Sequence, residues 1–441
     1  MTNYTYLREK KASSLKKFYD ASFEEKDVLS IHSYNDATIL PLRRFPNDSI
    51  LFGRGGVVSN ENEYISESAI PNRVQGYYEH TIKKKINKKV VYCGYFVNQW
   101  GHFLIEAVAR LWYFLEKDDS IDHYVFFVNE NEKRIISGNF KVFFELLGIL
   151  DKIVLINEPT QYREVIIPEL SYNRSNYFSN QYKRIFNYIA EKAINPEVEA
   201  KFSKIFFSRS KISRINQKEF GLEMLDDFFE RNGYKVLHPE QLNLKDLINF
   251  IQNADEIATM SGSVHHNLLF AQDNKKIIII ERNVLNNEIQ VDINRIKNFN
   301  TTYIDANIPI YPIDLGLGPF IIANNNLLQA FTENNGYRSV SKKYSSDNYL
   351  KHLFKLYMKC YRKFYAYNWY MEHWMLNSYD YIREGYEAGF QYYGKFLIGK
   401  KPFLLKHYFD IQYLRRNAID FILSNQHKKF IKMISKILWN L

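Results

Sequence analysis

The stretch EIATMSGSVHHNLLFA, residues 256–271, contains the pattern that decides the fold. The apolar and β-branched residues at its start predict a buried strand, and the small residues SGS predict a tight turn after it. The apolar run that follows predicts the opening of a helix. A buried strand that turns directly into a helix is the repeating unit of α/β proteins with mainly parallel sheets, so we expect that fold class.

The same alternation continues on both sides of this stretch. The neighbouring expected elements are strands over 204–208, 234–237 and 276–281, and helices over 218–232 and 244–254. An earlier series has strands over 89–95, 123–128, 152–156 and 164–168, and helices over 99–116, 141–150 and 181–194. We therefore predict two Rossmann-like halves, with ligands bound at the carboxyl ends of the strands.

The length of 441 residues exceeds the size at which a single hydrophobic core stops growing. We expect a β-rich N-terminal element over 1–88, Rossmann-like domains over 89–202 and 203–325, and a basic, aromatic-rich helical extension over 341–441. In the N-terminal element, strands over 36–42 and 49–65 are expected around a turn at GRGG, residues 53–56.

The composition is that of a globular protein, with 46% hydrophobic and 24% charged residues, which excludes a disordered chain. Cys93 and Cys360 are the only cysteines, too few for a disulfide scaffold, so we expect a reducing compartment, the cytoplasm. The segment 1–20 carries five Lys or Arg and no apolar run of signal-peptide length. No uncharged apolar run approaches the ~18 residues of a membrane span, so neither secretion nor spanning is expected.

The positive charge of the chain is concentrated at its C-terminal end. Residues 341–441 hold 18 Lys plus Arg against 7 Asp plus Glu, a balance of +11, while the whole chain has +10. Near the end, Lys428, Lys432 and Lys436 recur every four residues and share one helical face beside apolar residues. A basic amphipathic helix with aromatic anchors favours an anionic membrane surface. The alternative is a helical subdomain with a solvated lysine face.

The turn at the centre of the 256–271 stretch predicts an anion site. Free backbone N–H groups at the start of a helix attract phosphate without a specific side chain. An ordinary strand-to-helix turn is the alternative, and His265 and His266 cannot both face a ligand. The residues expected at this site are Ser261, Gly262, Ser263, His265, His266 and Asn267, with the amides of 263–265 as donors.

A second basic feature follows the strand at 204–208, where the loop SRSKISRIN spans residues 208–216. Arginine pairs bidentately with phosphate oxygens, so Arg209 and Arg214 are expected to neutralise a diphosphate, with Lys211 and Asn216 beside them. A solvated basic loop is the alternative. Glu281, at the end of the strand expected over 276–281, is expected to hold a ribose.

The helix expected at 99–116 begins with NQWGHFLIE, which places His102 and Glu106 four residues apart on one face. A histidine accepts a proton from a hydroxyl near neutral pH, and a neighbouring carboxylate raises its basicity. We expect His102 to be a general base and Glu106 to orient it. The alternative is an ion pair that merely stabilises the helix. No cluster of His, Cys and carboxylates at ligand spacing predicts a metal site.

Taken in order, these segments resemble glycosyltransferase family 61. The resemblance is carried by a Gly-His-aromatic-Leu-x-Glu helix at 101–111, a Ser-Arg loop at 207–216 and the turn leading into NLLF within 239–281, and it spans roughly residues 50–282. It implies a GT-B fold, with two Rossmann-like domains facing a cleft, and metal-independent, inverting transfer from a nucleotide sugar without a cofactor. Gln217 and the SGSVHH turn depart from the family pattern and leave the donor open.

The resemblance gives each segment an expected role. The 89–202 domain would bind a glycan or lipid-linked acceptor and the 203–325 domain the nucleotide sugar. The absence of an N-terminal anchor points to the bacterial branch, which makes capsule polysaccharide or lipopolysaccharide. We expect a cytoplasmic enzyme, peripheral on the inner face of the cell membrane through its C-terminal extension, with no nucleic-acid partner.

Two other classes of function are compatible with the sequence. A non-catalytic membrane-surface scaffold of a glycan assembly would keep the two Rossmann halves and act through its basic extension. A nucleic-acid binder would use the same cations and aromatics, but the basic segment has no recognisable nucleic-acid module.

Overall fold

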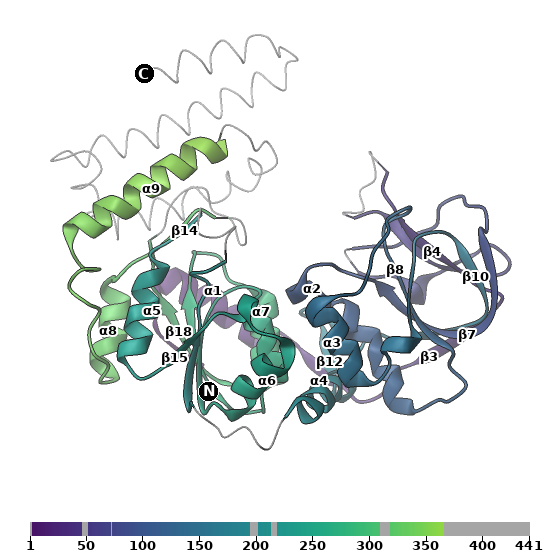
Figure 1. The fold of residues 1–441 in the computed structure, drawn as a ribbon, viewed down its shortest axis with the longest axis horizontal. Helices are drawn as coiled ribbons and strands as arrows, with labels where there is room; N and C mark the ends of the chain where they lie inside the picture. Colours follow the sequence, from purple (N-terminus) through teal and green to yellow (C-terminus); the bar gives the residue numbers. More distant parts are fainter. Residues whose placement is uncertain are drawn as a thin grey trace, which may run out of the picture.

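The computed structural model describes residues 2–45, 52–71, 73–194, 202–212, 218–308 and 318–365. Figure 1 shows two α/β units side by side, each built on its own sheet. The first unit contains the eight-stranded sheet and the second unit the six-stranded sheet. The mixed α/β class expected from the sequence is confirmed.

The six-stranded sheet of the second unit is parallel throughout. Its central strands are apolar on both faces, as in the Ile277–Ile280 run, because helices cover both sides of the sheet. In spatial order the strands are β15 (Lys235–Leu237), β13 (Lys204–Phe207), β16 (Glu256–Met260), β17 (Lys276–Glu281), β18 (Asn300–Asp305) and β1 (Thr2–Tyr6).

Helices cover opposite faces of this sheet, and its strand order reverses at one point. Helices α5 (Leu222–Arg231) and α8 (Asn326–Asn334) pack on one face, and α6 (Leu244–Asn253) and α7 (Glu288–Ile296) on the other. The chain leaves β13 toward β15 and returns past it to β16, so the strand order reverses between β13 and β16. Ligands of such sheets bind outside the carboxyl ends of the strands at this reversal.

The N-terminal segment, residues 2–20, belongs to the second unit. Strand β1 pairs in parallel with β18, and helix α1 (Glu9–Asp20), purple in Figure 1, lies among the teal elements of that unit. The sequence analysis had grouped residues 1–88 in one N-terminal element. Strand β1 was not expected, and its partner strand begins only at Asn300, beyond the reach of any local signal.

The sheet of the first unit is mixed. Its strands in spatial order are β6 (Tyr64–Ile65), β5 (Arg54–Val58), β4 (Thr38–Arg43), β10 (Thr160–Pro168), β7 (Lys84–Tyr95), β8 (His123–Phe127) and β9 (Ile153–Ile156), with β3 (Ile31–Asn35) also on β10. The 53–56 segment is not the expected turn, because β5 begins at Arg54 and its glycines pair closely with β4. Strands β3 to β6 of the 1–88 segment thus extend the first sheet.

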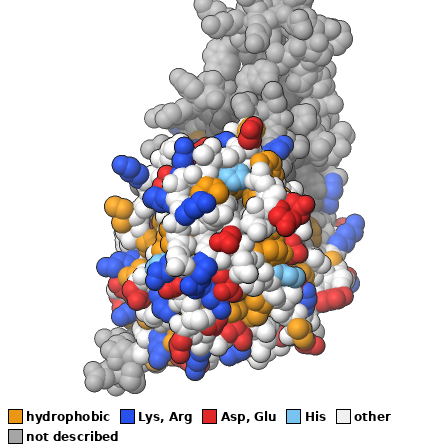
Figure 2. Space-filling model, turned by 90° about the vertical axis from the view of Figure 1, so that its right-hand side faces the viewer, with side chains coloured by type: hydrophobic (Ala, Val, Ile, Leu, Met, Phe, Trp, Pro, Cys, Tyr) orange, Lys and Arg blue, Asp and Glu red, His pale blue; other side chains and the backbone are white. Residues whose placement is uncertain are grey.

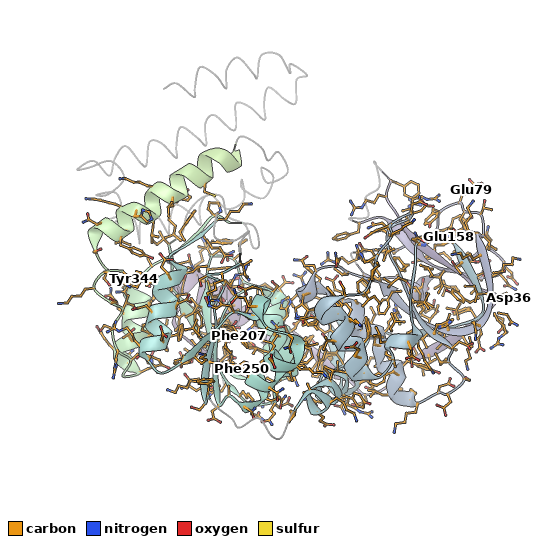
Figure 3. The ribbon with its side chains drawn as sticks, in the orientation of Figure 1. Asp36, Glu79, Glu158, Phe207, Phe250 and Tyr344 are labelled. Atoms are coloured by element: carbon orange, nitrogen blue, oxygen red, sulfur yellow. The ribbon has the colours of Figure 1, made fainter. Side chains whose placement is uncertain are left out.

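The two units share a continuous hydrophobic core. Phe270 of the second unit lies 6.4 Å, between ring centroids, from Phe143 of helix α3 (Gly138–Leu147) and 5.4 Å from Phe186 of helix α4 (Asn180–Ala193). Figure 3 labels Phe207 and Phe250 in the second unit, where both belong to this core or pack against it. The units are therefore held against each other by buried apolar surface.

Two expected helices have different bounds in the structure. The helix expected over 99–116 is a short α-helix, α2 (Trp100–Ile105), followed by a 3₁₀ helix over Ala107–Glu116, in which the Ala109 N–H bonds back to Glu106 O. The helix expected over 218–232 begins only at Leu222, because Glu219 and Phe220 form strand β14 (Glu219–Phe220).

Two small sheets complete the described structure. They consist of β11 (Tyr172–Asn173), β12 (Tyr177–Ser179) and β2 (Glu24–Lys26), and of β14, β20 (Phe320–Ile322) and β19 (Asn307–Ile308). Figure 2 views the first unit from its outer side and shows acidic and basic side chains interspersed on that face.

Only the start of the expected helical extension is described. It contains helix α9 (Asp347–Tyr365), as expected for a helical segment, and the rest of the 341–441 extension lies outside the described residues. No helix in the described part of the chain is both long enough and apolar enough to cross a membrane.

Candidate active site

A buried cluster of charges lies at the carboxyl ends of β13 and β17, beside the point where the strand order reverses. Arg209, in the loop after β13, contacts the Glu219 carboxylate with Nε and Nη2, each at 3.2 Å. Arg282, directly after β17, donates from Nη1 to the same carboxylate at 2.7 Å. The three side chains are 6% exposed or less. Two guanidinium groups thus share one carboxylate at the edge where a ligand is expected.

Arg209 is therefore not the solvated loop cation that the sequence pattern allowed. It is 5% exposed, and Glu219 holds its guanidinium in place. The loop pattern gave no sign of this, because Glu219 belongs to a two-residue strand that the sequence predicts as helix. A buried guanidinium with a fixed partner is preorganised for anion binding, since little side-chain entropy remains to be lost.

Gly262 brings the loop after β16 against Arg282. Its φ is +120°, and a Cβ at this position would lie 2.8 Å from Arg282 Nη2. Any other residue would be strained in this backbone conformation and would displace the guanidinium. The neighbouring Ser261 is buried, and its Oγ accepts a hydrogen bond from the Arg282 N–H at 3.3 Å. The SGS turn therefore supports the arginine cluster.

The backbone amides of the turn are arranged differently from the expected anion site. The helix that follows is a 3₁₀ segment, His265–Phe270, and the N–H groups of His265 and His266 bond to the carbonyls of Gly262 and Ser263. The His265 amide is thus already used, which removes it from the expected donors at 263–265. The first N–H groups of a regular α-helix have no partner within the helix. In this tight turn of small residues, the corresponding N–H groups of His265 and His266 are bonded to backbone carbonyls three residues earlier.

Neither histidine of the turn faces solvent. His265 is fully buried, and its Nε2 donates to Asn294 Oδ1 at 2.9 Å. Burial lowers the pKa of His265 to about 3, so the ring is neutral and belongs to the core. The structure therefore packs both histidines, where the sequence analysis expected at least one at the ligand.

His266 lies at the contact between the two units. Its Nδ1 is 3.1 Å from the carbonyl oxygen of Gly101, which only accepts hydrogen bonds, so Nδ1 bears the proton. Burial lowers the pKa of His266 to about 4, and the ring is neutral at pH 7. His102 and Glu106 both act electrostatically on this ring, which places it beside the expected catalytic pair.

Helix α2 of the first unit contacts the SGS turn and the segment after it in the second unit through Gly101 and Trp100. A Cβ on Gly101 would lie 2.7 Å from both His266 Nδ1 and Ser263 Cβ, so only glycine permits this approach. Trp100 Nε1 donates to Asn267 Oδ1 at 2.8 Å. Asn267, expected at the anion site, thus has a structural role between the units.

His102 and Glu106 are joined as expected, with a third residue beside them. His102 Nδ1 lies 2.9 Å from Glu106 Oε1. Arg73, from the loop before β7, places Nη2 2.5 Å from the same Glu106 oxygen and 3.0 Å from His102 Nδ1. The three side chains are 18 to 26% exposed. An imidazole, a carboxylate and a guanidinium therefore meet at the surface of the first unit that faces the second.

A short path of contacts connects this triad to the arginine cluster. His102 follows Gly101, which packs against Ser263, and Ser263 follows Gly262, which packs against Arg282. Arg282 in turn shares Glu219 with Arg209. The candidate base and the candidate diphosphate site thus lie on adjoining loops, although they belong to different sheets of the fold.

Glu281 has a cation that the sequence did not suggest. Lys11 of α1 donates from Nζ to Glu281 Oε2 at 2.9 Å and to the carbonyls of Asn283 and Leu285 at 2.7 and 3.1 Å. Both charged side chains are 2% exposed. Burial raises the pKa of the Glu281 carboxyl, and Lys11 opposes that rise. The expected role of Glu281 with a ribose stays a prediction, with its carboxylate engaged by Lys11.

The other cations of the loop after β13 are only partly described. Lys211 is exposed in the turn that follows Arg209, and its charge contributes to a lowered pKa at His238, after desolvation of that ring. Arg214 and Asn216 lie outside the described residues. Their expected roles stay predictions.

Sequence reasoning missed four residues of these clusters: Arg73, Glu219, Arg282 and Lys11. Arg282 directly follows Glu281 at a strand end, so the same carboxyl-end rule would have found it. Arg73 and Lys11 come from segments with no motif, and only the folded chain brings them to their partners. Among the described residues, no three His, Cys, Asp or Glu side chains are grouped closely enough to hold a metal ion.

Residues 100–278 match the family model of glycosyltransferase 61. The matched stretch covers less than half of the chain, but it begins at α2 and includes His102, Glu106, Arg209 and the SGS turn. It supports the resemblance on which the catalytic roles rest, while Arg73, Lys11 and Arg282 lie outside it. A comparison with curated proteins gives no significant match.

Proposed function

We propose that this protein is a glycosyltransferase that moves a sugar from a nucleotide-sugar donor to a hydroxyl group of an acceptor. The observation that carries the proposal is the contact between Gly101, the neighbour of His102 in α2, and the SGS turn of the second unit, within the stretch that matches the family. A base beside a diphosphate site is the arrangement that sugar transfer requires. The reaction must remove a proton from the acceptor while negative charge develops on the leaving diphosphate.

The donor diphosphate binds at the carboxyl ends of β13 and β17, beside the point where the strand order reverses. Arg209, held by Glu219, presents its guanidinium there, and the exposed Lys211 adds a second charge at the rim. Preorganised cations stabilise the leaving group as its charge grows, without reorganisation during the reaction. Arg282 also donates to the Glu219 carboxylate, so Glu219 and Arg209 keep their positions when the diphosphate binds.

His102 removes the acceptor proton. In the tautomer in which Nδ1–H donates to Glu106, the lone pair of Nε2 is available to the acceptor hydroxyl. Arg73 contacts the same carboxylate oxygen and holds the Glu106 side chain in position beside His102. Attack from the acceptor side, opposite the diphosphate, inverts the anomeric centre. The step needs no metal, since the cations at the strand ends neutralise the leaving group.

The acceptor is a glycan or lipid-linked glycan, and the pathway is bacterial surface polysaccharide synthesis, either capsule or lipopolysaccharide. This part of the proposal rests on the resemblance alone. The GT-B arrangement fits two α/β units joined through α2 and the SGS turn.

A thermal-shift screen with nucleoside diphosphates and nucleotide sugars tests the donor site. A ligand at about a hundred times its dissociation constant stabilises a protein by ~2.7 kcal/mol.

Arg209→Gln should weaken diphosphate binding by about 10- to 100-fold, because a charge-assisted contact contributes ~1.5 to 3 kcal/mol. The control is Arg338→Gln. Arg338 is exposed and lies near Asn232, at the amino ends of the strands, away from the carboxyl ends where the diphosphate is proposed to bind. Equal diphosphate affinity in a folded Arg209→Gln protein would remove Arg209 from the site.

The basic extension is proposed to attach the enzyme to an anionic membrane surface. Its balance of +11 supports this, since each Lys or Arg near an anionic leaflet contributes roughly 1 kcal/mol. Flotation with anionic liposomes should recover the full chain and recover less after truncation at residue 365, which removes 11 Lys plus Arg and 6 Asp plus Glu, a balance of +5 of the +11. Release by salt should be incomplete because aromatic anchors add apolar burial. Full-length protein that ignores anionic liposomes would contradict the membrane role.

A further inference from the structure

A cavity of about 510 Å³ opens beside Glu106. Its wall is formed by residues from the loop before β7, from α2 and the 3₁₀ helix after it, from the β11–β12 hairpin and from the start of α7. The volume lies within the roughly 300 to 1,000 Å³ of small-ligand pockets. Both units thus contribute to one pocket, on the acceptor side of the His102 triad.

The position of the pocket connects it to the reaction. Glu106 lines the cavity, and its Oε1 is the atom that contacts His102 Nδ1. His102 does not itself line the cavity, so a sugar bound at this end lies one side chain, Glu106, away from the proposed base. This step rests on the proposed function.

The charges in the wall are paired within the wall. Arg73 contacts Glu106 at 2.5 Å, and Arg174 contacts Glu288 at 3.0 Å. Ser175 Oγ donates to the same Glu288 carboxylate at 3.3 Å. Among the described residues that line the cavity, each arginine has its own carboxylate. Two arginines and two carboxylates give the described wall no net charge, unlike the cluster at Glu219, where two guanidinium groups share one carboxylate. The wall therefore has no excess positive charge for an anionic ligand, whereas hydroxyl groups find both donors and acceptors in place.

The rest of the wall is largely apolar. It consists of Ile70, Pro71, Ile105, Ala109 and Leu170, with Tyr172 and Asn173 of the hairpin beside them. A sugar ring has polar hydroxyls at its edge and C–H groups on its faces, so it matches a pocket with ion pairs on one side and aliphatic side chains on the other. A nucleobase or a phosphate does not have this division.

The hairpin that closes the pocket is held rigidly. Asp292 of α7 accepts hydrogen bonds from Tyr172 OH at 2.7 Å and from the Ser175 N–H at 2.9 Å. Tyr172 is 4% exposed. The hairpin of the first unit is thus tied to α7 of the second, and the cavity between them is preformed.

We propose that this cavity is the acceptor subsite and that it takes an uncharged sugar residue, excluding a uronic acid or a phosphorylated sugar. Specificity arises from the balanced charge of the described wall, which has no excess positive charge for an acidic substituent. The subsite is separate from the diphosphate site at Arg209.

The test is a binding titration of the full chain by ligand-observed NMR with matched sugars. The neutral probes are the methyl glycosides of glucose and galactose, and the charged probes are the methyl glycosides of glucuronic acid and galacturonic acid and methyl glucoside 6-phosphate. At least one neutral probe should bind, and its charged counterpart should bind at least about tenfold more weakly. Glu288→Gln frees Arg174 from its partner, so it should reduce this preference by about tenfold or more.

The matched control is Glu61→Gln, which removes an exposed carboxylate from the turn between β5 and β6 and should leave the preference unchanged. Three results would overturn the proposal: equal binding of charged and neutral probes, an unchanged preference in folded Glu288→Gln, or no binding of any probe at millimolar concentration. Diphosphate binding is measured separately, so a chain that binds neutral sugars but no nucleotide keeps the subsite and loses the transferase function.

Discussion

His102→Ala should lower the rate of sugar transfer by about 100-fold or more while donor affinity stays nearly unchanged. A positioned general base contributes typically ~10² to 10⁴ to the rate. The imidazole is in the first unit and contacts Glu106 and Arg73, so its loss does not touch the Arg209–Glu219–Arg282 cluster. A variant that loses turnover with unchanged affinity has lost an interaction made only in the transition state.

The measurement is single-turnover transfer with saturating donor, together with the donor dissociation constant from calorimetry. His80→Ala is the comparison, because His80 is another partly buried histidine of the first unit, with Nδ1 3.2 Å from Tyr78 O. Wild-type turnover in His102→Ala would exclude it as the base. Loss in His80→Ala or Glu106→Gln instead would transfer the role to that residue.

Lys11→Met should destabilise the folded protein by about 3 to 5 kcal/mol, because it removes the cation from a buried pair and leaves Glu281 charged without a partner in the core. It also leaves the carbonyl groups of Asn283 and Leu285 without the Lys11 donor. Chemical denaturation at pH 7 measures the difference. Lys16→Met on the same helix is the control, because Lys16 is exposed and the change in charge is identical.

The deficit in Lys11→Met should depend on pH. Burial raises the pKa of Glu281, and removal of Lys11 raises it further. A carboxyl group with a raised pKa in the folded state takes up its proton more readily folded than unfolded, so stability increases as the pH falls through that pKa. The loss should be largest at neutral pH and shrink in acid. A loss equal to that of Lys16→Met at pH 7 would show that the pair does not hold α1 to the sheet.

The strands and the location of the site could be predicted from sequence because both are local properties. The 256–271 stretch contains a buried strand, a small-residue turn and an apolar run, and each of these patterns is formed by residues adjacent in the sequence. The carboxyl-end rule then predicts ligand binding at the loops of Arg209 and Ser261, and the structure brings Arg209 and the SGS turn to the Arg282 side chain between them. The i, i+4 spacing of His102 and Glu106 predicted their contact, which the structure confirms at 2.9 Å.

What could not be predicted depends on partners distant in the chain. Strand β1 pairs with β18, Lys11 with Glu281 and Arg8 with Asp305, so each contact joins the start of the chain to its second unit. Burial of Arg209 depends on Glu219, which lies in a strand too short to leave a periodic pattern. The His265 N–H bonds to the Gly262 carbonyl within a 3₁₀ turn, and the same turn packs closely on Gly101 through Ser263. No sequence pattern within either unit predicts this contact between the units.

The central claim is that helix α2 and the SGS turn, which meet at Gly101, form the active site of a glycosyltransferase. The most direct test incubates the full chain with the nucleotide sugar selected by the screen and a panel of neutral glycan acceptors. It follows released nucleoside diphosphate and the anomeric configuration of the product by NMR. We predict diphosphate release that requires an acceptor hydroxyl and a product with inverted configuration. A donor that binds but stays intact with every acceptor would contradict the claim and indicate a non-catalytic scaffold.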